Sequence, residues 1–90
     1  MSIRRSRLEI IHDILRVTND KGGRILPTHL LYKSNLSHER MKGYIEELKQ
    51  KQLLEEVQEK DKQFFAITEQ GRKFLMQYHQ LKEFTEAFGL

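Results

Sequence analysis

Basic side chains gather at three places in the chain: an N-terminal run, a central segment, and a short charged stretch near residue 61. The residues concerned are Arg4, Arg5, Arg7, Lys33, His38, Arg40, Lys42, Lys60 and Lys62. Guanidinium, ammonium and imidazole groups donate hydrogen bonds to anions, and phosphate is the anion they most often meet. Ser37 adds a hydroxyl within the central segment. Anion binding is the chemistry predicted, and a charged surface that serves only solubility is the alternative.

The sequence lacks the patterns that support catalysis or metal binding. It contains no cysteine, which excludes disulfides, thiolate ligands and thiol nucleophiles. Gly22-Gly23 is not followed by the lysine and hydroxyl of a phosphate-binding loop. The histidines fall on separate expected elements, without the helical spacing of a metal pair: His12, His29, His38 and His79. We therefore predict a protein that is not an enzyme and that needs no cofactor or metal, and no small-molecule ligand is evident.

Length and composition indicate one small soluble domain. The chain has 90 residues, of which 38% are hydrophobic and 32% charged, and no apolar run approaches the roughly 18 residues of a membrane span. The apolar residues near the start are interrupted by charges, so no signal peptide is predicted. We expect a cytoplasmic protein without membrane contact. Through Gln50 there are ten Lys or Arg against six Asp or Glu, and from Lys51 onward six against seven, so the positive charge lies with the first half.

Helical spacing and stop signals divide the first half into elements. Residues 6–18 form a predicted helix with an apolar face of Leu8, Ile11, Ile14, Leu15 and Val17. Residues 19–23 end it at paired glycines, and residues 24–26 are predicted to form a short bridging strand. Thr28 is the expected N-cap of a helix over residues 28–34, which buries Leu30 together with Leu31 or Tyr32.

A longer helix is predicted from Ser37 to Lys51, with Ser37 as its N-cap. Its apolar stripe consists of Met41, Tyr44, Ile45 and Leu48, and its opposite face of Glu39, Gly43, Glu46 and Gln50. His38 and Lys42 flank the exposed first turns, and Glu39 and Glu46 are expected to orient Arg40 and Lys42 through helical spacing. A short helix, a tight break at residues 35–36 and a longer helix make a helix-turn-helix arrangement.

The remaining chain reads as a hairpin followed by a long helix. Residues 53–59 and 63–67 flank the polar tip Lys60–Lys62. Strand alternation predicts that Val57, Phe65 and Ile67 face the core while Glu56 and Phe64 face away. Thr68 is the expected N-cap of the last helix. That helix carries an apolar seam of two residues in seven, which Leu75 and Phe84 widen: Gly71, Phe74, Tyr78, Leu81, Thr85 and Phe88.

The seam extends further along the last helix than a domain of this size needs. A second copy of the chain is the simplest partner for it, and a helix that folds back on its own domain as a monomer is the alternative. We expect Phe74, Tyr78, Leu81, Phe84, Thr85 and Phe88 to form the dimer contact.

The ordered elements resemble an archaeal winged helix-turn-helix DNA-binding family, including small chromatin-associated proteins of Sulfolobus. The residues that carry the resemblance are Arg7, residues 9–11, 14–15 and 31–37, Tyr44-Ile45 with Leu48, Leu53-Leu54, and residues 67–71. The resemblance implies a mainly α fold with a small β-hairpin, the wing. Residues 1–70 then form the winged domain, and residues 71–90 a continuous helix that dimerises as an antiparallel coiled coil.

The resemblance also implies a function. The chain is expected to bind double-stranded DNA as a homodimer, as a transcription regulator or a nucleoid-associated chromatin protein. The helix from Ser37 to Lys51 would enter the major groove, and the wing, Lys60 to Gln63, would lie on the DNA backbone. The alternative is a winged helix that docks an acidic protein partner and binds no DNA.

Overall fold

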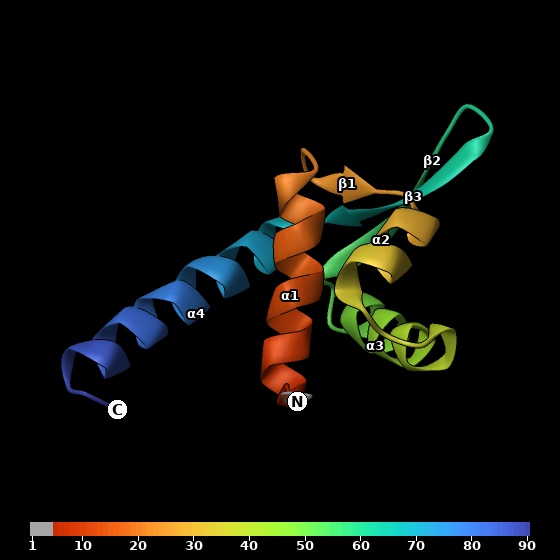
Figure 1. The fold of residues 1–90 in the computed structure, drawn as a ribbon. Helices are drawn as coiled ribbons and strands as arrows, with labels where there is room; N and C mark the ends of the chain where they lie inside the picture. Colours follow the sequence, from red (N-terminus) through yellow and green to blue (C-terminus); the bar gives the residue numbers. More distant parts are fainter. Residues whose placement is uncertain (1–4) are drawn as a thin grey trace.

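The computed structural model describes residues 5–90 and shows four helices around a small sheet (Figure 1). The predicted fold class, mainly α with a β-hairpin and a long last helix, is confirmed. Arg4, one of the residues expected to bind phosphate, lies outside the described residues. The elements are α1 (Arg7–Asp20), β1 (Arg24–Ile25), α2 (Pro27–Ser34), α3 (His38–Gln50), β2 (Leu54–Glu59), β3 (Lys62–Ile67) and α4 (Glu69–Ala87).

Helix α1 begins with a capping box that holds its first turn. The Ser6 hydroxyl accepts from the Glu9 amide and the Glu9 carboxylate accepts from the Ser6 amide, both at 3.1 Å. The hydrogen bond from the Ser6 backbone lowers the pKa of Glu9. The predicted apolar face is buried except for Leu8, whose side chain is 46% exposed. Leu8 lies at the edge of that face in the first turn, so its prediction as a core residue is wrong.

Helix α2 begins one residue earlier than predicted. Pro27 occupies its first position, where a fixed φ and a missing N–H suit a helix start. Leu26 is the N-cap and Thr28 lies inside the helix, so the prediction of Thr28 as N-cap is wrong. Leu30 is fully buried and Leu31 packs against the core, whereas Tyr32 is 88% exposed. Of the two residues expected beside Leu30, Leu31 is therefore the core residue.

The sheet is antiparallel in the order β1-β3-β2. Leu54 pairs with Ile67, Glu56 with Phe65, and Val57 with Phe64. Directly opposite residues share a face of the sheet, so Glu56 lies on the core side with Phe65, and Val57 lies on the other side with Phe64. The prediction is right for Phe64, Phe65 and Ile67 and wrong for Val57 and Glu56. Alternation within each arm does not specify how the two arms are paired, and the pairing decides which face each residue occupies.

Helix α4 is anchored at its start and projects away from the domain. The Thr68 hydroxyl accepts from the Gly71 amide at 3.0 Å, which confirms Thr68 as the N-cap. The next turns pack on α1, where the Tyr78 ring stacks on His12 with centroids 4.2 Å apart. Beyond that contact α4 extends outward, so the C-terminus lies far from the sheet (Figure 1). None of the helices described in residues 5–90 is both long and apolar enough to cross a membrane.

Candidate nucleic-acid interface

The turn between α2 and α3 sets the direction of α3. Asn35 adopts a left-handed conformation with φ +57°, which reverses the chain after α2. Leu36 is 9% exposed and fixes the turn to the core. The Ser37 hydroxyl then accepts from the Arg40 amide at 3.2 Å, as predicted for the N-cap. These contacts present the first turns of α3 at the surface.

The apolar stripe of α3 is buried as predicted, and the opposite face is exposed. Met41, Ile45 and Leu48 are at most 6% exposed, and Tyr44 packs against the same core. The exposed residues are Glu39, Gly43, Glu46 and Gln50, with His38 and Lys42 on one flank and Arg40 on the other. A Cβ placed on Gly43 would meet no atom within 4 Å, so the α3 backbone is open to close approach there.

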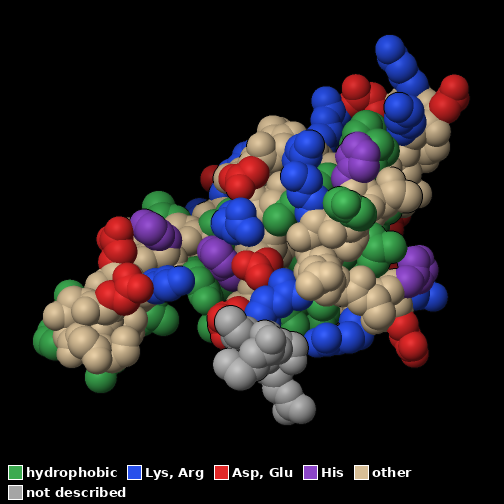
Figure 2. All heavy atoms as spheres, viewed as in Figure 1, with side chains coloured by type: hydrophobic (Ala, Val, Ile, Leu, Met, Phe, Trp, Pro, Cys, Tyr) green, Lys and Arg blue, Asp and Glu red, His purple; other side chains and the backbone are tan. Residues whose placement is uncertain are grey.

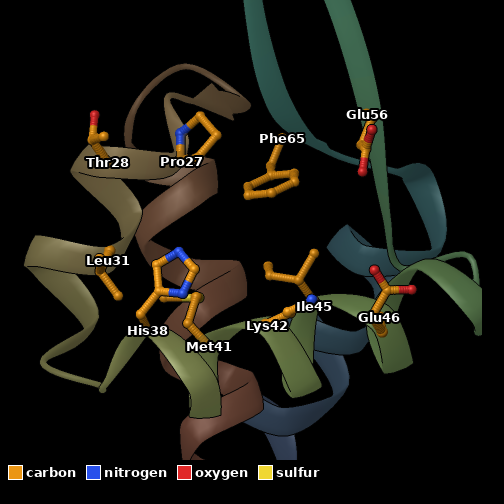
Figure 3. Close-up of a pocket in the computed structure, with 10 residues that line it drawn as sticks. All are labelled: Pro27, Thr28, Leu31, His38, Met41, Lys42, Ile45, Glu46, Glu56 and Phe65. Carbon is orange, nitrogen blue, oxygen red and sulfur yellow. The ribbon is translucent and has the colours of Figure 1, made fainter.

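A groove runs between α2, the exposed flank of α3 and the base of the hairpin. Figure 3 shows the side chains around it, with the Phe65 ring over the His38 and Lys42 side of α3. Its volume is about 220 Å³, and its lining residues are Pro27, Thr28, Leu31, His38, Met41, Lys42, Ile45, Glu46, Glu56 and Phe65. The floor is apolar and the rim carries both signs of charge. His38 and Lys42 therefore stand beside the hairpin rather than on the outermost ridge of α3.

The N-terminal arginines make contacts within the chain. Arg5 donates to the Asp13 carboxylate at 2.9 Å and to the Ser34 carbonyl at 2.8 Å, which ties the start of α1 to the end of α2. Arg7 forms an ion pair with Glu47 of α3. A shallow hollow on this side of α3 is lined by Arg7, Arg40, Gly43, Tyr44 and Glu47. The structure thus brings Arg7 and Arg40 together and places Arg5 in a structural contact.

The lysines at the ends of α2 and the hairpin are exposed. Lys33 lies in the last turn of α2. Lys60 sits in the hairpin turn with φ +56°, and Lys62 begins β3. Figure 2 shows Lys and Arg side chains gathered at the outer end of the hairpin, next to acidic ones. These lysines are reachable by a long anionic partner.

The predicted pairing of Lys42 with Glu46 is absent from residues 5–90. Glu46 instead lies 4.0 Å from Lys49, which also donates to Glu56 of β2. The hydrogen bond to Glu56 raises the pKa of Lys49, so this lysine stays charged. This link could not be predicted from the sequence, because Lys49 and Glu56 lie on different elements and the register of the hairpin decides whether they meet.

The seam of α4 is covered near its start and open near its end. Phe74 and Leu75 pack against the core, and Tyr78 is half-buried on His12. Leu81, Phe84 and Phe88 are 58%, 62% and 68% exposed. Phe84 and Phe88 contact one another with ring centroids 4.9 Å apart. We call these three residues, with Thr85, the distal seam.

Comparisons with known proteins agree with this geometry. A family model described as winged helix-turn-helix matches residues 4–86. The structure of Sso10a-2, a DNA-binding protein from Sulfolobus solfataricus, superposes with a TM-score of 0.75 at 23% identity, covering 93% of this chain and 85% of that one. F93 from STIV, a winged-helix DNA-binding protein, gives 0.74 at 21% identity, covering 89% and 92%.

A third solved structure, of BpsR from Bordetella bronchiseptica, has a TM-score of 0.72 at 19% identity, covering 87% of this chain and 58% of that one. The DNA binding of BpsR is regulated by 6-hydroxynicotinic acid. Sequence comparison with curated proteins gives no match. At these identities the three structures establish a shared fold, in which a helix-turn-helix is followed by a hairpin and a long helix.

Proposed function

Because the chain belongs to the winged helix-turn-helix family, we propose that it binds duplex DNA as a homodimer, as a transcription regulator or a nucleoid-associated chromatin protein in the cytoplasm. The observation that carries the proposal is the arrangement of α3 and the hairpin. Both border one groove, which His38 and Lys42 of α3 line, and the hairpin continues from the groove to the exposed Lys60 and Lys62 at its outer end. Sso10a-2 and F93, which share the fold, are DNA-binding proteins.

In this proposal α3, from its cap at Ser37 to Lys51, enters the major groove, and the wing, Lys60 to Gln63, lies along the backbone. His38 and Lys42 contact phosphates or base edges, and Gly43 permits close approach. Lys60 and Lys62 contact phosphates. These two lysines supply affinity without sequence readout, because a phosphate is the same at every base pair.

Further phosphate contacts come from Lys33 at the end of α2 and from Arg40 and Arg7 on the other flank of α3. Arg7 is 61% exposed on its side chain although it pairs with Glu47, so a phosphate can replace Glu47 as its partner. Arg5 has a different role in the proposal. Its guanidinium already serves Asp13 and the Ser34 carbonyl, and it therefore supports the helix-turn-helix from behind.

The distal seam supports the dimer. An exposed row of Leu81, Phe84 and Phe88 on one helix face is a surface that soluble monomers rarely present. We propose that a second copy covers it, with the two α4 helices packed as an antiparallel coiled coil. Residues 1–70 act as the DNA-binding domain and residues 71–90 as the dimerisation helix. The contact of Tyr78 with His12 would fix the angle between them.

A second candidate function is a protein-interaction module that binds no DNA. The observation that favours it is the outermost ridge of α3, where Glu39 and Glu46 are exposed together with the uncharged Gly43 and Gln50. Two carboxylates on this outermost ridge repel the phosphates of a DNA backbone. In this case the basic flanks of α3 and the wing would meet an acidic protein surface.

Equilibrium binding to a labelled DNA duplex across a salt series separates the two candidates. For a DNA-binding protein the logarithm of the affinity falls linearly with the logarithm of salt concentration, by about 0.9 per phosphate neutralised. Replacing Lys60 and Lys62 together by alanine should reduce that slope by about 1.8 for each subunit whose wing contacts the DNA. Lys73→Ala on the exposed side of α4 is the matched control and should leave it unchanged.

Absence of binding to any duplex at low salt would end the DNA proposal. If binding occurs, selection from random duplexes distinguishes the two DNA roles. Enrichment of one sequence indicates a regulator, and no enrichment indicates a chromatin protein.

A further inference from the structure

The hairpin carries more negative than positive charge, which is unusual for an element proposed to touch DNA. Residues 54–63 hold two lysines, Lys60 and Lys62, against four acids: Glu55, Glu56, Glu59 and Asp61. An unpaired carboxylate beside a phosphate backbone weakens association. Within residues 5–90, two of these acids, Glu56 and Glu59, have a basic partner in the body of the domain.

Glu56 links the hairpin to the end of α3. One carboxylate oxygen accepts from the Lys49 ammonium and the other from the Gln63 side-chain amide of β3, each at 2.5 Å. Lys49 lies in the last turn of α3 and is also 4.0 Å from Glu46. Glu56 and Glu46 stand at the same end of the groove in Figure 3. Both oxygens of Glu56 are thus used, one toward α3 and one across the hairpin.

Glu59 links the opposite side of the hairpin to β1. It forms an ion pair with Arg24, whose guanidinium also lies 5.6 Å from the centroid of the Phe64 ring. Arg24 is opposite Ala66 in the sheet, on the face away from the core. The hairpin therefore has one ionic link to the body on each face, from α3 through Lys49 and from β1 through Arg24.

We propose that Glu56 and Glu59 are positioning residues that hold the wing at a fixed angle to α3. The inference rests on the proposed function, because the fixed angle lets Lys60 and Lys62 reach the backbone while α3 occupies the major groove. Single exposed ion pairs add little stability. Two links on opposite faces instead restrict the direction of a hairpin that is already paired, and they neutralise carboxylates that would otherwise repel phosphate.

The proposed role of Glu56 predicts a change in DNA affinity opposite to the change that net charge alone predicts. Glu55→Ala and Glu56→Ala change the net charge equally, at neighbouring positions on opposite faces of β2. Glu55 is exposed, and neither the ion pairs nor the side-chain hydrogen bonds within residues 5–90 include it. Charge alone makes both variants bind DNA more tightly. With Glu56 as a positioning residue, Glu55→Ala tightens binding about twofold, whereas Glu56→Ala weakens it roughly tenfold. The salt slope of Glu56→Ala falls by up to about 1.8 for each subunit, because each wing loses two lysine contacts.

The second measurement needs no DNA. Backbone order parameters from NMR relaxation report the mobility of the wing directly. For residues 60–62 they should fall from roughly 0.85 toward 0.6 in Glu56→Ala but not in Glu55→Ala. Glu59→Ala should act as Glu56→Ala does. Equal tightening by the Glu55 and Glu56 variants, or an unchanged wing in the Glu56 variant, overturns the inference. If even the unmodified chain binds no duplex, the proposed function fails, and the order parameters alone decide whether Glu56 holds the wing.

Discussion

Helices α3 and α4 both carry an apolar stripe at helical spacing, but the two stripes have different surroundings. In α3 the stripe of Met41, Ile45 and Leu48 is buried against the chain's own core. In α4 the first part of the seam is covered by α1 and the sheet, while Leu81, Phe84 and Phe88 are more than half exposed. Hydrophobic periodicity indicates that a face will be covered, and it leaves open whether the same chain or another one covers it.

The difference follows from where each helix is held. Helix α3 is held at its start by the turn at Asn35 and at its end by the hairpin that follows. Among the contacts within residues 5–90, those that hold α4 lie in its first half: the Thr68 cap, the close packing of Gly71 and the stack of Tyr78 on His12. Its second half extends past the domain (Figure 1). Substitutions in the buried stripe of α3 and in the exposed part of the α4 seam should therefore have different effects.

The largest effect is expected from truncating the buried stripe. Leu48 is 0% exposed, so Leu48→Ala should lower the free energy of unfolding by about 3 kcal/mol. Leu81→Ala should have a smaller effect that grows with protein concentration, because in the proposed dimer a second copy buries that side chain. Urea unfolding at two protein concentrations measures both. An equal loss for the two variants at every concentration would remove the distinction between the stripes.

The distal seam is tested more sharply by a charge. Leu81→Glu should convert dimers to monomers and weaken DNA binding about a hundredfold, since two linked binding modules gain that much from avidity. Met76→Glu is the matched control, because Met76 is 55% exposed on the same helix but lies off the seam. Sedimentation velocity and duplex binding report the two effects. Dimers that persist in Leu81→Glu would contradict the assignment of the seam.

Gly71 in α4 and Gly43 in α3 differ in how closely other atoms surround them, and replacing each by alanine tests that difference. A Cβ on Gly71 would lie 2.5 Å from the Leu53 carbonyl oxygen and 2.6 Å from an Ile67 carbon, so Gly71→Ala should destabilise the fold by roughly 2 kcal/mol. Gly43 has open space, and Gly43→Ala should stabilise the helix by up to about 1 kcal/mol. Thermal unfolding measures both. Similar midpoints for the two variants would show that the start of α4 is not tightly packed.

The smallest effect concerns pH at the contact between α1 and α4. Burial lowers the pKa of His12, and this outweighs the opposite influence of Asp13. The neutral ring is therefore favoured in the folded state, and its contribution to stability is present above the unfolded pKa near 6.5 and lost as pH falls through the lower folded value.

His12→Phe keeps a ring for stacking on Tyr78 and removes the titration. Its thermal midpoint should fall less between pH 7.5 and pH 5 than that of the unmodified chain. His29→Gln, at an exposed position of α2, should retain the original dependence. If His12→Phe follows the same pH curve as the unmodified chain, His12 does not titrate at this junction.

Local signals in the sequence were sufficient for most of the fold. The caps at Ser37 and Thr68, the glycine break at residues 22–23 and the stripe of α3 all depend on residues close together in the chain, and all are found in the structure. Pro27 shows the limit of reading caps alone, because its own preference for the first helical position displaced the expected cap at Thr28.

Features that depend on distant pairing were not predictable in the same way. The face occupied by Val57 follows from its pairing with Phe64, which no local pattern specifies. The exposure of Leu8 and Tyr32 depends on which elements reach α1 and α2. The links of Lys49 to Glu56 and of Arg24 to Glu59 join separate elements, so the Glu56 and Glu59 carboxylates acquire these partners only in the folded chain.

The proposed dimer requires that a second copy of the chain covers the distal seam, which is exposed in a single copy. Sedimentation equilibrium of the unmodified chain, over a range of concentrations, tests it most directly. At micromolar concentration the expected mass is twice the 10.8 kDa of a single chain, and it should shift toward the single mass on dilution. A mass of 10.8 kDa at every concentration would show that Leu81, Phe84 and Phe88 remain uncovered, and would contradict the dimer.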